Sequence, residues 1–162
     1  MQRLKDWLAA LAIGIAIALV FGSFDQKPNL PDQAPSFALT DLQGDDLVLD
    51  EMLGQTVIIN FWASWCGPCK QEIPDFSRFA REHPDIAVLG LAVDSGELPD
   101  VRRSAQQLGI DYTVAIADRQ TVSDYDISAF PTTVVVGPAG EVSHVQVGVM
   151  SYKQLNRVTD GL

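Results

Sequence analysis

The spacing of apolar residues along the chain predicts strands that alternate with helices. Short apolar runs bounded by turn residues are typical of buried strands. The five runs of this kind are Val57–Phe61, Ile86–Val93, Tyr112–Ala117, Thr132–Val136 and Val142–Val147. Only Gly137–Gly140 and the residue after it separate the last two runs, which predicts a hairpin of antiparallel strands.

Apolar residues three or four positions apart predict the helices between these strands. A helix over about Cys69–Glu82 should stop before Pro84, because the residue that precedes a proline resists helical geometry. Pro74 lies inside this helix and should kink it. The other expected helices contain Val101–Leu108 and end at Gly109, follow Asp118, or begin after Ser151.

Residues 37–49 precede this alternation and predict a small β-hairpin. Phe37–Thr40 and Leu47–Leu49 flank a polar turn rich in Asp and Gly. Strand–helix repeats followed by a hairpin and a last helix predict an α/β layered fold with antiparallel strands at one side of the sheet.

The first residues differ in kind, because Trp7–Phe24 is an uncharged apolar run. Its length is at the lower limit for a membrane-spanning helix, and Arg3 and Lys5 before it would keep this end in the cytoplasm. Ala16-Ile17-Ala18 has the form of a signal cleavage site but lies inside the run, so an uncleaved anchor is favoured over a cleaved signal. We expect a membrane anchor or signal segment over residues 1–24, a proline-rich linker over 25–36, and one domain over 37–162.

Composition and charge fit an exported globular domain. The chain has 162 residues, is 47% hydrophobic and carries a formal net charge of −10. Arg3, Lys5 and Asp6 contribute +1, so the rest of the chain carries −11. An acidic domain does not favour nucleic acid or anionic membrane surfaces as partners.

The candidate chemistry lies in Phe61–Lys70, which reads Phe-Trp-Ala-Ser-Trp-Cys-Gly-Pro-Cys-Lys and holds the chain's two cysteines. Cys66 comes just before the predicted helix, where unpaired backbone N–H groups and the helix dipole stabilise a thiolate. A thiolate attacks disulfides, and Cys69 can then close the ring across the tight Gly67-Pro68 turn. We therefore expect a thiol–disulfide exchange site, with Cys66 and Cys69 as the catalytic pair and with neither a metal nor a further cofactor.

This stretch resembles the active site of thioredoxins, and Asn60–Cys69 is closer to the membrane-anchored TlpA/ResA-like branch. The resemblance covers roughly residues 35–162 and implies a thioredoxin fold with an N-terminal β-hairpin extension, here preceded by the expected single transmembrane helix. In thioredoxin-like proteins the proline that opens the fourth strand is cis and lies beside the cysteines, so Pro131 would line a substrate groove. Phe130 would offer backbone groups and an apolar wall there, with ordinary core packing as its alternative, and Trp65 would cover the cysteine pair.

Three polar residues bear on proton transfer at the second cysteine. Cytoplasmic thioredoxins carry a buried aspartate where this chain has Asn60, which cannot accept a proton. ResA-like proteins place a functional acid in a similar Gly-Glu step, so we expect Glu97 to assist deprotonation of Cys69, with a solvated loop acid as the alternative. Glu72 matches an acid common in the TlpA-like branch, but we expect it to be a charge on the helix surface.

The resemblance implies a thiol–disulfide oxidoreductase held at the cell membrane, with its domain on the extracytoplasmic (periplasmic or outer) side. Gly67-Pro68 is similar to the reducing thioredoxins, which favours reduction of disulfides in exported proteins. The expected clients are the cysteines of apocytochrome c, in cytochrome c biogenesis, or of copper-site proteins. Catalytic reduction there requires electrons from a membrane thiol donor, which the resemblance suggests is of the DsbD/CcdA type.

Other functions stay open at this point. A structural zinc site would need two more Cys or His ligands, and His83 and His144 do not form a ligand-like pair. A peroxiredoxin would need its reactive cysteine in a Pro/Thr-rich loop, unlike Ser64-Trp65-Cys66. The alternatives are a Cu(I)-binding metallochaperone of the same fold, although such proteins space their cysteines by three and add a histidine, and a thiol oxidant that donates disulfides.

Overall fold

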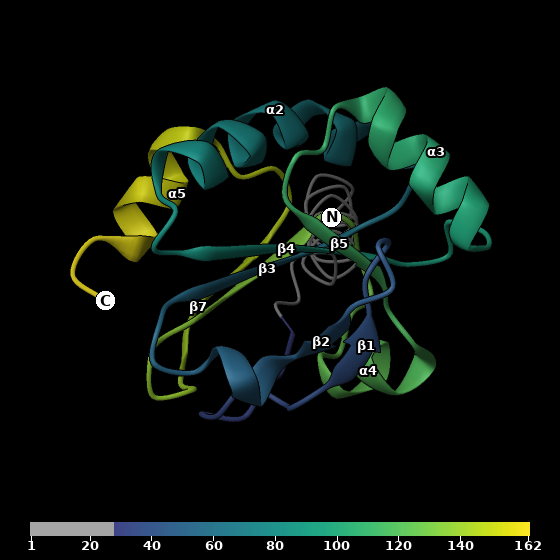
Figure 1. Cartoon of the computed structure of the whole chain (residues 1–162). Coiled ribbons are helices and arrows are strands. Elements are labelled where there is room, and N and C mark those ends of the chain that lie inside the picture. The colour runs from purple at the N-terminus through teal and green to yellow at the C-terminus, as the bar shows by residue number, and fades with distance from the viewer. Residues whose placement is uncertain (1–27) are drawn as a thin grey trace, which may run out of the picture.

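The computed structural model describes residues 28–162, which form a thioredoxin-like α/β fold around a five-stranded sheet (Figure 1). The strand order is β5-β4-β3-β6-β7, and β6 and β7 are antiparallel to their neighbours, as expected. The central strand β3 pairs in parallel with β4 and antiparallel with β6. The strands are β3 (Val57–Trp62), β4 (Ala87–Ala92), β5 (Thr113–Ile116), β6 (Thr132–Val136) and β7 (Val142–Val147).

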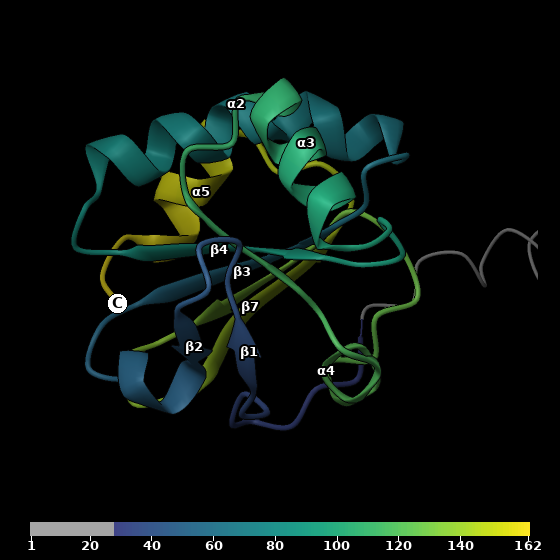
Figure 2. The same cartoon turned by 45° about the vertical axis from the view of Figure 1, so that its right-hand side comes forward.

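Helices cover one face of this sheet, and smaller elements cover the other (Figure 2). The first layer consists of α2 (Gly67–Glu82), α3 (Leu98–Leu108) and α5 (Tyr152–Thr159). The second consists of β1 (Ala38–Thr40), β2 (Asp46–Val48), the 3-10 helix η1 (Leu49–Met52) and α4 (Arg119–Asp124). The antiparallel pairing of β1 with β2 confirms the expected N-terminal hairpin. Helix α2 begins two residues earlier than expected and continues through Pro74.

Burial of the sheet on both faces explains the continuous apolar runs of its central strands. All six residues of β3 are buried, with Ile58 packed toward α2 and α5 and Ile59 packed toward the β1–β2 side. A strand that is covered on both sides has no solvated face, so its sequence does not alternate between apolar and polar residues.

The segment expected as a proline-rich linker lies against the domain in its described part, residues 28–36. Ala34 N–H donates to the Gly140 carbonyl at 2.9 Å, in the β6–β7 turn. At the other end of the segment, Asn29 N–H donates to the Asp126 carboxylate at 3.0 Å. This N-terminal strap therefore spans the domain from the β6–β7 turn to the loop that follows α4.

None of the helices within residues 28–162 combines the length and the hydropathy needed to cross a bilayer. The anchor expected over residues 1–24 lies outside the described residues.

Candidate active site

The two cysteines form a disulfide at the start of α2. The S–S distance is 2.04 Å, and Cys66 occupies the N-cap position of the helix. The backbone N–H of Cys69 donates a hydrogen bond to Cys66 Sγ at 3.1 Å. This N–H, which has no partner within the helix, is directed at the sulfur that would carry the negative charge of a thiolate in the reduced protein.

The two sulfur-bearing residues differ in their access to solvent. Cys66 is 5% exposed and Cys69 is fully buried, whereas Gly67 and Pro68 between them are exposed. Both cysteines belong to an apolar cluster with Trp62. Because only Cys66 reaches the surface, it is the one that an external disulfide can meet first.

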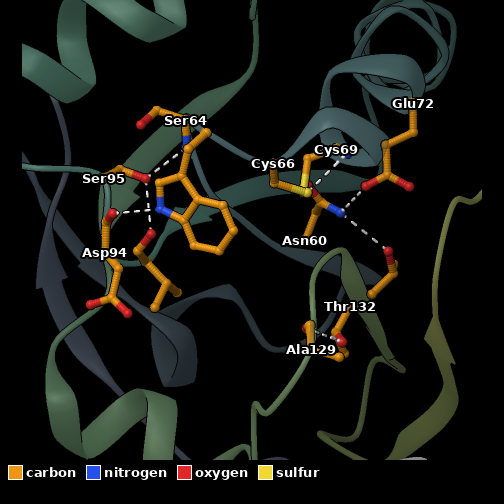
Figure 3. Close-up of a disulfide and its surroundings, with 12 residues drawn as sticks. Asn60, Ser64, Cys66, Cys69, Glu72, Asp94, Ser95, Ala129 and Thr132 are labelled. Atoms are coloured by element: carbon orange, nitrogen blue, oxygen red, sulfur yellow. Dashed lines mark hydrogen bonds between the residues drawn. A yellow bond between two sulfur atoms is a disulfide. The ribbon is translucent and has the colours of Figure 1, made fainter. Parts of the chain in front are cut away.

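An exposed indole stands beside the disulfide. Trp65 is 62% exposed, yet its Nε1–H donates to the Asp94 carbonyl at 2.9 Å, which fixes the ring against the loop after β4. The same loop makes a second hydrogen bond to the segment just before Cys66, because Ser64 N–H donates to Ser95 Oγ at 2.9 Å (Figure 3).

Phe130 meets this indole from the loop between α4 and β6. Its ring contacts Trp65 edge-on, with the ring centroids 5.8 Å apart, and it packs against the apolar cluster of both cysteines. The Phe130–Pro131 peptide bond is cis, and the Pro131 carbonyl accepts a hydrogen bond from Gly148 N–H at 2.8 Å. The structure thus brings Phe130, from a distant part of the chain, to the segment that carries both Trp65 and the disulfide.

The prediction that Glu72 is a charge on the helix surface is wrong, because Glu72 is buried. It lies three residues after Cys69 on the inner face of α2 and is 1% exposed. Its carboxylate accepts hydrogen bonds from Asn60 Nδ2 at 2.7 Å and from Met150 N–H at 2.8 Å. Burial raises the pKa of Glu72 from 4.5 to about 7, although both hydrogen bonds act to lower it.

Asn60 connects this acid to the sheet. It is fully buried on β3, and its Nδ2 donates to Thr133 Oγ1 at 3.2 Å as well as to Glu72. Figure 3 shows its amide nitrogen directed toward the Glu72 carboxylate. Asn60, which stands where cytoplasmic thioredoxins carry an aspartate, therefore orients the carboxylate of Glu72 on α2.

Comparison with known proteins supports the same chemistry. A family model described as the AhpC/TSA family matches residues 30–145. The chain belongs to this thioredoxin-like family. It is 34% identical over 153 residues to the thiol-disulfide oxidoreductase ResA of Bacillus subtilis (strain 168), covering 92% of this chain and 86% of that protein. It is 29% identical over 167 residues to the thioredoxin-like protein YneN of the same organism, covering 97% of this chain and 98% of that protein.

A solved structure agrees with these relatives. The thiol:disulfide interchange protein of the thioredoxin family from Chlorobium tepidum TLS has a TM-score of 0.72 and 30% identity, over 83% of this chain and 96% of that one. With its Cys66–Cys69 disulfide, this member of the AhpC/TSA family is a TlpA/ResA-like thiol–disulfide oxidoreductase.

Glu97 follows the loop that contacts Ser64 and Trp65 in this oxidoreductase. It is exposed at the N-cap position of α3, where its backbone carbonyl accepts hydrogen bonds from Asp100 and Val101. Within residues 28–162 no hydrogen bond joins its carboxylate to the disulfide or to Glu72. Its role in deprotonating Cys69 stays a prediction.

The sequence did carry a signal for Glu72. Cys69, Glu72, Ile73 and Phe76 recur at spacings of three and four, so all of them lie on the inner face of α2. A charged residue among three buried positions is expected to be buried with them. No cluster of three or more His, Cys, Asp or Glu side chains suited to a metal occurs among the described residues.

Proposed function

We propose that this oxidoreductase is a membrane-anchored, extracytoplasmic reductase of protein disulfides. The observation that carries the proposal is the N-cap position of Cys66, with the Cys69 N–H directed at its sulfur. This arrangement stabilises a Cys66 thiolate in the reduced protein, and a thiolate is the species that attacks a disulfide.

Reduction of a client then begins at Cys66. Its thiolate attacks one sulfur of the client disulfide, forms the Cys66–client mixed disulfide and releases the other client sulfur as a thiolate, which takes a proton from solvent. The exposed Trp65 and the adjoining Phe130 offer the apolar surface on which the client chain lies during this step.

Release of the client requires Cys69 to lose its proton. We assign acceptance of this proton to the Glu72 carboxylate, because Glu72 lies one helical turn away and has a pKa of about 7. The Cys69 thiolate attacks Cys66 Sγ, the bond from Cys66 to the client breaks, and the client leaves as its second thiolate. Two electrons have passed to the client, and the enzyme ends in its disulfide form.

Each turnover leaves the enzyme oxidised, so continued reduction needs an electron source. We assign this role to a membrane thiol donor of the DsbD/CcdA type, and we assign apocytochrome c or copper-site cysteines as clients, both from the resemblance to TlpA/ResA-like proteins. The named relatives of this chain support cysteine-containing proteins as its substrates.

The position of the N-terminal strap supports a membrane donor. Asn29 is bound to Asp126, five residues before Pro131 on the loop that leads to the redox centre. An anchor that ends at Phe24 has about 14 Å of extended chain at most before Pro28. Such an anchor would keep the redox end of the sheet close to the bilayer, within reach of a membrane protein.

The equilibrium reduction potential of the Cys66–Cys69 pair tests the direction of electron flow. Titration in dithiothreitol or glutathione buffers, followed by Trp65 fluorescence and thiol alkylation, should give a value near that of thioredoxin, about −270 mV. A value of about −120 mV would instead assign a disulfide donor. A pair that does not cycle, but whose reduced form binds Cu(I) in a manner lost in Cys66→Ser, would assign a metallochaperone.

A further inference from the structure

A cavity of about 320 Å³ opens beside the redox centre, on the α4 side of the sheet. Strands β3, β4 and β5 are parallel, so their carboxyl ends meet at one edge. Residues that follow β3 carry the cysteines, and residues that follow β4 and β5 line the cavity. Its apolar lining consists of Val93, Ala117, Val122 and Ile127, and its polar lining consists of Asp94, Asp118, Arg119, Ser123 and Asp126.

The cavity shares one residue with the surroundings of the disulfide. Asp94 belongs to both, because its carbonyl binds the Trp65 indole while the residue lines the cavity. Figure 3 shows the Asp94 side chain directed away from Cys66. On the other side, Ile127 of the cavity and Phe130 of the redox surface lie on one loop, three residues apart. A polypeptide that lies across Trp65 and Phe130 would therefore reach the cavity within a few residues of its reacting cysteine.

The charges at the cavity have one predominant sign. Three acidic residues, Asp94, Asp118 and Asp126, and one basic residue, Arg119, line it. Within residues 28–162 Arg119 forms no ion pair with any of them. The Asp118 carboxylate accepts the Thr121 N–H, which lowers its pKa, so it stays ionised at neutral pH. A lining that combines apolar and acidic residues suits a side chain with an aliphatic stem and a cationic end.

We propose that this cavity is a subsite that binds an arginine or lysine side chain of the client polypeptide, a few residues from the cysteine that Cys66 attacks. The inference rests on the proposed function only in taking the substrate to be a disulfide-bearing polypeptide. The subsite would give this oxidoreductase a preference among clients that the disulfide alone does not provide, because basic clients gain an electrostatic contact that neutral ones lack.

The test compares disulfide peptides that carry arginine or its uncharged isostere citrulline at each of the positions flanking one cysteine. The single-turnover rate constant with the reduced protein is measured for each peptide at low salt. We expect the arginine peptide to react about five-fold faster than its citrulline partner at one or two positions, and this ratio to fall toward one in 0.5 M NaCl.

Two double variants assign the effect to the cavity. Asp94→Asn with Asp126→Asn should bring the arginine-to-citrulline ratio to about one, and asparagine tolerates the positive φ of both positions, 44° and 49°. The matched control, Asp85→Asn with Asp160→Asn, removes the same net charge beside a different cavity and should keep the wild-type ratio.

The outcomes separate the subsite from the proposed function. Equal rates for arginine and citrulline peptides at every position, or an equal loss of preference in the control variant, would overturn the subsite while leaving reduction intact. Failure of the reduced protein to reduce any peptide, citrulline peptides included, would instead overturn the proposed function.

Discussion

Asn60 and Glu72 form a buried pair in which the strand supplies an amide and the helix supplies the acid. Their 2.7 Å hydrogen bond directs the Asn60 donor toward the carboxylate. Desolvation is the largest influence on this carboxyl, and it brings the pKa of Glu72 to about 7, the range that a proton acceptor needs at neutral pH. The proton acceptor that we propose for Cys69 thus lies on α2, because Asn60 at the strand position cannot accept a proton.

Replacing Glu72 by glutamine should slow release of the client. The change keeps the shape of the side chain but removes its ability to accept a proton, and general-base contributions are typically about 10²-fold or more. With a thionitrobenzoate disulfide as substrate, release of the second thionitrobenzoate reports the attack by Cys69. In the wild type this rate should rise with a midpoint near pH 7, whereas in Glu72→Gln this midpoint should be lost and the rate should rise only as the Cys69 thiol itself ionises.

Glu97→Gln is the matched control, because it removes the carboxylate of the exposed residue that the sequence predicted to assist deprotonation of Cys69. If Glu97 assists Cys69, this variant will change the thiol pKa values and the exchange rate. Unchanged values in Glu97→Gln beside a slowed Glu72→Gln would assign the proton to Glu72 alone.

Glu72 should also make the oxidised protein less stable as the pH rises. Its pKa is about 7 when folded and near 4.5 when unfolded, so between these values the folded state binds more protons. The stabilising contribution is complete below about pH 4.5 and is lost by about pH 7, a fall of up to about 3 kcal/mol. Urea unfolding of the wild type and Glu72→Gln across this range measures the difference, and parallel pH curves would contradict it.

The connection between β7 and α5 joins two parts of the site. Gly148 N–H donates to the Pro131 carbonyl, and two residues later Met150 N–H donates to Glu72, both at 2.8 Å. Ser151 then begins α5 with a capping box completed by Gln154. One short segment thus positions both the proline of the groove and the buried acid.

Gly148→Ala should alter the pH dependence of exchange as well as stability. Gly148 has φ of 93° with no atom within 4 Å of an added Cβ, so the cost is backbone strain, about 1–2 kcal/mol. Relief of that strain moves the Met150 N–H that lowers the pKa of Glu72, so the pH midpoint of thionitrobenzoate release should rise.

Gly109→Ala is its control, because Gly109 ends α3 with φ of 66° and equally open surroundings. It should cost a similar free energy of unfolding without moving the midpoint. A midpoint shifted equally by both variants would show a general effect of destabilisation rather than a specific one.

Across the molecule, the N-terminal strap reaches the same end of the sheet that carries the disulfide. The carboxyl ends of β3, β4 and β5 bring the disulfide and the acidic cavity to one edge, and Asn29 binds at the same cavity through Asp126. An anchor at the N-terminus, the disulfide and the client subsite would then share one side of the protein.

Membrane retention should depend on residues 1–24. We expect the full chain to remain with membranes through alkaline carbonate extraction and a chain beginning at residue 28 to be released, because Trp7–Phe24 supplies the apolar length for insertion. Release of the full chain would indicate a cleaved signal, which N-terminal sequencing of the recovered protein would locate.

Local signals were sufficient for most of the fold and for the reactive cysteines. Thr132–Val136 and Val142–Val147 are strands with the predicted bounds, because apolar runs and a Gly-Pro turn specify them within a few residues. Gly109 and Ser151 end and begin helices where their backbone and side-chain preferences predict. Cys66 could be assigned from its position before a helix, which is also a local property.

The placement of acids was decided by packing between distant segments. Helical spacing places Glu72 on the inner face of α2, but its partners Asn60 and Met150 come from distant segments. Glu97 fits a motif, yet it lies exposed at the start of α3. Likewise the cavity joins Asp94, Asp118 and Asp126 only because parallel strands end at one edge. Helix and turn preferences act over a few residues, whereas desolvation depends on every segment packed around a group, so the pKa of Glu72 is a property of the folded chain alone.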